Sequence, residues 1–522
     1  MALASLIRSS LLVTPPLALA LFFVITGFRG VNFGRHWDEV GWQIEPVRTM
    51  VESGILLPRS YIYPSFGRFL VLLPSIPAAI RAMHGPSVNA QAVQTAMLHA
   101  IDAPDYLLRV RRLYIVVSAL AVVWVYGAAL ALGRKPWEAF VAASGLGLSW
   151  EYAYHARWVA TDCILVQFSA MTLFAMALWY RTHRPGWLYA AAVAVGLGTG
   201  TKYPGVVLLV PVVVSSVLVL PARTLLGHVL GLAAVGGVAF AAYLITTPAT
   251  LLDPFAFFQQ LHGISAHYAG TSTHGGYSVT TRWQHYKLVV LYFALAYFSP
   301  YPVVAAMLLV SAFVGAVFWI RSEPRAAIPI ACFPLAFVVF FSSKYLVVIV
   351  RNYLLIVPFL AILAARGVAE TLSRLSWRWA RWSVGAALAG VLSAEAVWLL
   401  RAAESIRHVD PAAEVRQAVA YVGRHARTRF RLSSRVRSTA AQEKLILPAN
   451  VIDERGADEV VFVAPTEGPD YWHWRTNDPW LTKEVFGPRE VDFNWYSTWE
   501  GHERIVVMST DKAKKMGIEL AE

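Results

Sequence analysis

The chain has 522 residues, of which 57% are hydrophobic and 15% are charged, and its mean hydropathy is +0.51. It is too apolar for a soluble globular protein and too long for a single domain. The net charge of +13 could favour nucleic acid, but many of the Lys and Arg residues lie in short segments between apolar runs, where membrane topology explains them better. We therefore expect a polytopic membrane protein whose partner is the lipid bilayer and not nucleic acid.

The two cysteines and the N-terminus add little to this class. Cys163 and Cys332 both lie inside apolar runs, so we expect neither a disulfide nor a cysteine-based metal site. Arg8 precedes the first apolar run, but no small-residue cleavage site follows it. We expect this run to be retained as a first span.

Apolar runs of about 20 residues, the length needed to cross the hydrocarbon core, recur along the chain. Two further apolar pieces, 66–80 and 288–298, are broken by Pro or are too short, and we expect juxtamembrane or half-inserted helices there. The eleven expected spans lie near 11–28, 111–132, 136–155, 163–180, 186–201, 203–221, 225–246, 300–320, 326–343, 352–366 and 382–400.

Lys and Arg fall unevenly on the two sides of these spans. One set of alternating loops carries eleven of them and the other set six, and the richer side is the cytoplasmic one. The richer set is Arg134, Lys135, Arg181, Arg184, Arg223, Arg321, Arg325, Arg366, Arg374, Arg378 and Arg381. The opposite, extracytoplasmic set is Arg157, Lys202, Arg282, Lys287, Lys344 and Arg351.

The composition changes abruptly to mixed polar sequence after about residue 400. Helix-like periodicity at 411–425 and short β-rich pieces at 459–464 and 504–508 predict a small α/β domain. We therefore expect residues 1–400 to form the membrane module, with outer loops at 29–110 and 247–287. Residues 401–522 would form an extracytoplasmic domain.

Acidic residues at the predicted outer surface are candidates for chemistry. Asp38 and Glu39 follow the first span, where they are either a solvated pair or part of an active site with a carboxylate base. Asp162 opens a later span, and an ionisable group at membrane depth is a functional candidate by default. The alternative for Asp162 is a helix cap or an ion pair with Arg157.

Four cations share the outer side with these carboxylates: Arg157, Lys202, Lys344 and Arg351. Lys202 either extends to the membrane interface or holds a phosphate. Together the cations are typical of a site for an anionic lipid head group beside a proton acceptor. Aromatic residues nearby either form an interfacial belt or line a substrate cavity; they are Trp37, Tyr61, Tyr63, Tyr203 and Tyr353.

Metal binding has little support in the sequence. Histidines His262, His267, His274 and His285 gather in the 247–287 loop, but their spacing matches no zinc motif. A flexible loop that closes over substrate fits the small residues of 270–276 better. We expect no metal site and no certain cofactor, although a divalent cation requirement stays open.

These motifs, in this order and on one side, resemble those of the polyprenyl-phosphate-dependent glycosyltransferases of the GT-C superfamily, which includes protein O-mannosyltransferases and lipid A aminoarabinose transferases. The resemblance covers roughly residues 11–366. It rests on Trp37-Asp38-Glu39, Tyr63-Pro64, Arg157 with Asp162, Gly198-Thr-Gly-Thr-Lys202, and the segment from Arg351 to Pro358.

The resemblance implies an all-α bundle of about 11–13 membrane helices with amphipathic helices in the first outer loop. It implies Asp38 as the catalytic carboxylate with Glu39 beside it, and Arg157 and Asp162 as organisers of the second part of the site. Lys202 would hold the donor phosphate. Pro64 is followed by Ser65, where many relatives have a second proline, and this departure weakens any inference about the acceptor.

The expected function is transfer of a sugar from a polyprenyl-phosphate donor to an extracytoplasmic hydroxyl on a protein, a lipid or a cell-wall glycan, with Asp38 as general base. The enzyme would sit as a multi-pass protein in the plasma (inner) membrane with its active site outside. No nucleotide-binding fingerprint is visible, and such a donor requires none. The alternative is a transporter or flippase that binds a lipid-linked anion without chemistry.

Overall fold

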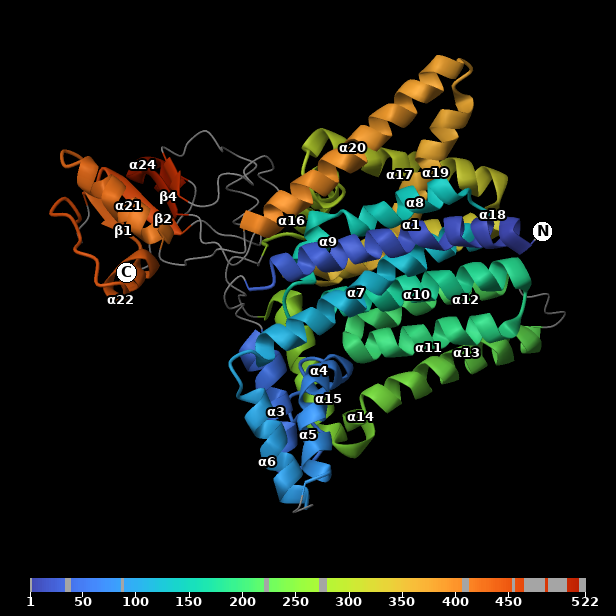
Figure 1. Ribbon diagram of the computed structural model, residues 1–522, viewed down its shortest axis with the longest axis horizontal. Helices are drawn as coiled ribbons and strands as arrows, with labels where there is room; N and C mark the ends of the chain where they lie inside the picture. Colours follow the sequence, from blue (N-terminus) through green and yellow to red (C-terminus); the bar gives the residue numbers. More distant parts are fainter. Residues whose placement is uncertain are drawn as a thin grey trace.

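The computed structural model describes residues 2–32, 39–85, 89–219, 225–271, 279–405, 413–452, 456–463, 484–486 and 505–515. Most of them form long helices that run side by side along the longest axis of the molecule (Figure 1). Each of the eleven expected spans contains a helix. Eight helical segments in the described ranges are long and apolar enough to cross a membrane; seven of them lie in expected spans, and the eighth, Phe66–Met83, covers the piece expected to be juxtamembrane. The predicted polytopic helical fold is therefore confirmed.

Within the described ranges the bundle is assembled from twelve helices, and one of them, α9, has only 6 residues. They are α1 (Ala2–Arg29), α7 (Tyr106–Ala131), α8 (Pro136–Gly147), α9 (Trp150–His155), α10 (Thr161–Thr182), α11 (Pro185–Thr201), α12 (Leu209–Val219), α13 (Leu225–Thr246), α17 (Pro302–Ser322), α18 (Pro324–Lys344), α19 (Val357–Arg374) and α20 (Arg378–Ser405).

Proline sets where four of these helices begin. Pro136, Pro185, Pro302 and Pro324 each occupy the first position of a helix, where the missing N–H costs no hydrogen bond. The predicted span 136–155 is wrong as one helix, because the chain breaks after Gly147 and restarts at α9. Ser149 caps the new helix by accepting a hydrogen bond from the Tyr152 N–H.

Helix α10 lies at the centre of the bundle and contacts α7, α11, α12 and α19. Over the apolar 18-residue stretch of α10, 78% of the residues are buried inside the bundle, against 17% for the corresponding stretch of α20. Glycine permits a close approach between α11 and α13. A Cβ at Gly196 would lie 2.2 Å from the Ala239 carbonyl oxygen, and one at Gly200 would lie 2.0 Å from the Thr246 hydroxyl. This four-residue glycine spacing is typical of helices packed inside membranes.

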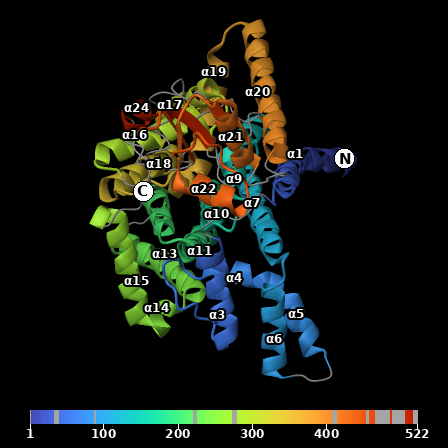
Figure 2. The ribbon, with the colours of Figure 1, turned by 90° about the vertical axis from the view of Figure 1, so that its left-hand side faces the viewer.

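Shorter helices gather at one end of the bundle, which we call the site end; there α1, α11, α13 and α18 finish and α7, α10 and α17 start. In Figures 1 and 2 the hairpin of α5 and α6 projects sideways from this end, transverse to the long helices, as expected for juxtamembrane helices. The shorter helices are α3 (Glu45–Ser53), α4 (Phe66–Leu72), α5 (Ile76–Met83), α6 (Ala90–Ile101), α14 (Ala249–Leu252), α15 (Pro254–Ala266) and α16 (Arg282–Tyr292).

The C-terminal part contains the expected small sheet. Its four described strands are β1 (Phe430–Leu432), β2 (Glu459–Val463), β3 (Glu484–Phe486) and β4 (Ile505–Ser509), in the order β1-β2-β4-β3. β1 and β2 are parallel, and β4 pairs antiparallel with β2 and β3. Helices α21 (Ala413–Arg424), α22 (Ser434–Gln442) and α24 (Thr510–Lys515) accompany the sheet, and α21 and α22 share its apolar core.

Candidate active site

Glu39 is the first of the predicted site residues that the structure describes. Its carboxylate is fully buried and forms a two-pronged ion pair with the equally buried Arg111 of α7. The Arg111 Nε lies 2.8 Å from Glu39 Oε1, and the Val159 N–H donates to the same oxygen at 3.0 Å. Arg111 also donates to the Val31 carbonyl at 2.9 Å.

These contacts join the end of α1, the start of α7 and the α9–α10 connection at one point. The Glu39 carboxylate is therefore placed to position the first outer loop. Asp38 directly precedes Glu39 in the chain, and Trp37 precedes Asp38. Both lie outside the described residues.

A second charged network joins three separate elements at the site end. Asp162, in the first turn of α10, lies 2.6 Å from the Nζ of Lys202, which follows the last residue of α11. Lys202 also donates to the Asn352 Oδ1 at 2.6 Å, and Asn352 belongs to the 3-10 helix η7 (Val350–Ile356). The Arg351 Nε lies 3.7 Å from the other carboxylate oxygen of Asp162 and its guanidinium stacks over Trp158 at 4.8 Å.

This network explains how charges can be buried here. Asp162, Lys202 and Arg351 are 5%, 8% and 3% exposed, and such burial is tolerated only when each charge is paired and hydrogen-bonded. The Asn352 amide nitrogen has no hydrogen-bond partner among the described residues. It is a donor that a bound ligand can use.

Arg157 lies elsewhere, although the sequence groups it with Asp162. Its guanidinium donates to the carbonyls of Ala153 and Thr26 and stacks over the Trp150 ring at 5.2 Å. The structure pairs Asp162 with Lys202 and Arg351 in its place. These contacts suit Arg157 to fastening α9 against α1.

A cavity of about 370 Å³ opens beside the Lys202 network. Lys202, Lys344 and Asn352 contribute its charged and amide groups, and most of the wall is aliphatic or aromatic. Val206 and Phe340 on this wall are 48% and 46% exposed, so the apolar side of the cavity reaches the outer surface of the bundle. A buried cation at one side and an open apolar wall at the other suit an amphiphilic ligand.

The predicted cavity tyrosines divide into two groups. Tyr63 and Tyr203 line the cavity. Tyr61 lies behind it, 1% exposed, and donates to the Asp253 carboxylate at 2.7 Å while its N–H donates to Gln260. Tyr61 therefore connects the first outer loop to the start of α15.

Tyr353 is also buried behind the wall. Its hydroxyl lies 2.7 Å from the Ser342 hydroxyl and 2.6 Å from the Nε2 of His285, whose Nδ1 is 2.8 Å from the Tyr345 carbonyl. Because the Tyr345 carbonyl can only accept a hydrogen bond, the proton of the neutral His285 ring lies on Nδ1. The Nε2 atom then accepts a hydrogen bond from the Tyr353 hydroxyl. His285 thereby holds α16 against the segment that carries Lys344.

Three residues of the site end were not singled out by the sequence: Arg111, Asn352 and Arg68. Arg68 is fully buried and donates to the carbonyls of Ser60 and Tyr63, which fixes the turn before α4. Arg68 lies in the first turn of α4 and Arg111 in the second turn of α7; both helices are apolar, and a buried arginine there requires a partner. Asn352 has no comparable signal, because one amide next to a predicted cation is common on protein surfaces.

Comparison with known proteins agrees with the motifs. Residues 95–254 match the family model described as dolichyl-phosphate-mannose-protein mannosyltransferase. The matched stretch includes Arg157, Asp162 and Lys202 and lies within the region that resembles the GT-C superfamily, so it confirms that resemblance. No curated protein sequence is similar enough to the chain to count as a match.

Two solved structures have a similar course of the chain at 14% sequence identity. One is the crystal structure of ArnT from Cupriavidus metallidurans bound to undecaprenyl phosphate, with a TM-score of 0.46 over 96% of this chain and 98% of that chain. The other is the same protein in the apo state, with a TM-score of 0.45 over 99% of both chains.

Proposed function

Because residues 95–254 resemble glycosyltransferases of the GT-C superfamily, we propose that this integral membrane protein transfers a sugar from a polyprenyl-phosphate donor to an acceptor hydroxyl outside the cytoplasm. The acceptor belongs to a protein, a lipid or a cell-wall glycan. Counted over the short loops that follow the long first outer loop, Lys and Arg are more numerous at the end of the bundle opposite the site end, which favours an extracytoplasmic site in the plasma (inner) membrane.

The observation that carries this proposal is the cavity beside Lys202. A polyprenyl-phosphate sugar is amphiphilic, with a charged phosphate next to a long apolar chain. The phosphate fits between Lys202, Asn352 and Lys344, and the isoprenoid leaves along the wall that includes Val206 and Phe340. A water-soluble nucleotide sugar has no long apolar chain that could pack against such a wall.

The charged network supports the leaving group. When the bond between the anomeric carbon and the phosphate oxygen breaks, its electron pair stays on the phosphate, which leaves as a lipid monophosphate. Lys202 and the Asn352 N–H groups stabilise the negative charge that develops there. Asp162 and Arg351 hold Lys202 and η7 in place, so no large reorganisation is needed during the reaction.

The acceptor hydroxyl must lose a proton as its oxygen bonds to the anomeric carbon. We assign the proton acceptor to Asp38, which neighbours the anchored Glu39 in the chain. The contacts of Glu39 suit a positioning role, since its oxygens accept from Arg111 and the Val159 N–H. The reaction thus uses one carboxylate for chemistry and a second to hold the loop.

The test is sugar transfer by purified protein from a panel of radiolabelled polyprenyl-phosphate sugars across protein, lipid and glycan acceptors. Wild type should transfer label, and Asp38→Asn should lose at least about a hundredfold in rate at equal folded yield. Asp511→Asn, which removes an exposed carboxylate of α24, is the matched control and should be unaffected. Donor binding without transfer by wild type, across all acceptors, would instead support the carrier alternative.

A further inference from the structure

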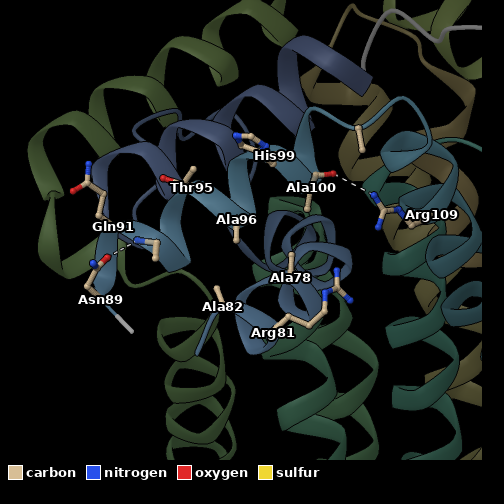
Figure 3. Close-up of a pocket in the computed structure, with 12 residues that line it drawn as sticks. Ala78, Arg81, Ala82, Asn89, Gln91, Thr95, Ala96, His99, Ala100 and Arg109 are labelled. Atoms are coloured by element: carbon tan, nitrogen blue, oxygen red, sulfur yellow. Dashed lines mark hydrogen bonds between the residues drawn. The ribbon is translucent and has the colours of Figure 1, made fainter. Parts of the chain in front are cut away.

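The α5–α6 hairpin contains a groove that the proposed reaction does not use. It lies between α5, α6 and the first turn of α7, is widely open to the outside and has a volume of about 980 Å³. Figure 3 shows a floor of small side chains, including Ala78, Ala82 and Ala96, with longer polar side chains around it. The small floor leaves room for a ligand.

Three basic side chains from three elements line this groove: Arg81 of α5, His99 of α6 and Arg109 of α7. None of the lining residues is acidic. Arg109 does lie 3.3 Å from Asp105, but that pair is solvent-exposed and therefore weak. The groove is thus complementary to an anion.

The two faces of α5 indicate where this groove lies relative to the bilayer. Ile76, Ile80 and Met83 recur on one side of the helix and are 37%, 49% and 52% exposed. Arg81 and Ala82 of the groove fall on the opposite side, at 100° per residue. A helix with its apolar side in the acyl chains places its polar side at the level of the head groups.

Figures 1 and 2 show the hairpin projecting sideways beyond the bundle at the site end, so its surroundings are the membrane interface. We propose that the groove binds the anionic head group of a membrane phospholipid, with Arg81 and Arg109 on the phosphate and His99 as a hydrogen-bond donor. This site is separate from the cavity beside Lys202 and does not depend on glycosyl transfer.

The test uses native mass spectrometry of the full chain in detergent with equimolar dioleoyl phosphatidylglycerol and dioleoyl phosphatidylcholine. Each interfacial cation favours an anionic lipid by about fivefold, so Arg81→Gln/Arg109→Gln should lower the phosphatidylglycerol preference by roughly 30-fold. Arg81→Lys/Arg109→Lys should keep most of it. Arg112→Gln/Arg282→Gln removes the same charge at exposed positions outside the groove and should change it less than twofold.

Three results would overturn the proposal. They are a wild-type protein without preference for phosphatidylglycerol, an equal loss in the control variant, and displacement of the lipid by soluble glycerol phosphate at similar concentration. None of these measurements is of sugar transfer. A negative lipid-binding result therefore does not contradict the proposed activity, and a negative transfer result does not contradict this lipid site.

Discussion

The Glu39–Arg111 ion pair provides the most quantitative prediction, because both side chains are fully buried. Glu39→Met would leave the Arg111 guanidinium without its carboxylate, and the loss of one partner from a buried pair costs about 3–5 kcal/mol of unfolding free energy. Arg111→Met should cost about the same. In the double variant neither charge of this pair remains.

The double variant should therefore be less destabilised than either single variant. It still leaves the Val31 carbonyl and the Val159 N–H without the partners they have now, at about 1–2 kcal/mol each. We expect a total cost of about 2–4 kcal/mol, against about 6–10 kcal/mol for the sum of the two single changes.

The assay is reversible unfolding of the purified protein by SDS in mixed micelles, followed by tryptophan fluorescence. The exposed pair Arg48–Glu52, at 2.9 Å, is the control, and its double replacement by Met should change stability by less than about 1 kcal/mol. The reasoning is refuted if Glu39→Met costs under about 1 kcal/mol, or if the double variant loses as much as the two single variants combined.

Three further changes probe the cavity, the buried contacts of α16 behind its wall, and the helix packing. Asn352→Asp places a negative charge beside the donor phosphate and should raise the KM for donor at least about tenfold. Asn352→Gln should have a KM nearer to that of wild type. Equal KM values for wild type and Asn352→Asp would contradict the assignment. His285 lies outside the candidate spans, and burial lowers its pKa to about 4, so the folded state favours the neutral ring. The contribution of the neutral ring to the unfolding free energy, up to about 3 kcal/mol, is complete above pH 6.5 and is lost as the pH falls through 4. His285→Gln should therefore reduce the loss of stability in acid, measured by unfolding at several pH values. An equal loss in wild type and variant would show that other groups cause it. Gly196→Leu should abolish the close contact of α11 with α13 and lower the yield of monodisperse protein in size-exclusion chromatography, whereas Gly236→Leu, on an open face, should not.

Hydrophobic length and proline placement explain why the bundle could be predicted. A run of about 20 apolar residues has few alternatives to a membrane helix, since its backbone groups must be paired internally. Pro302 and Pro324 mark helix starts that the composition also indicates. The break after Gly147 was missed because apolar residues such as Leu148 and Trp150 continue beyond it, although Ser149 and Glu151 interrupt the run.

The site was harder to predict than the fold because sequence patterns place residues on a side of the membrane but do not aim their side chains. Lys202 and Lys344 do meet at one cavity. Arg157, predicted with them, donates to backbone carbonyls of α1 and α9 instead. The 3-10 turn of η7 places Asn352 in the site, and the amino-acid composition of this segment does not predict that turn.

The central claim is that the lipid phosphate of the donor is held by Lys202. The most direct test is the Kd of unglycosylated polyprenyl monophosphate for wild type, Lys202→Met and the charge-balanced Lys202→Met/Asp162→Asn, with folding checked by the SDS titration. We predict that both variants bind at least about 30-fold more weakly, and that Lys287→Met, at an exposed position of α16, binds as wild type does. A folded Lys202→Met protein with wild-type affinity would contradict the account.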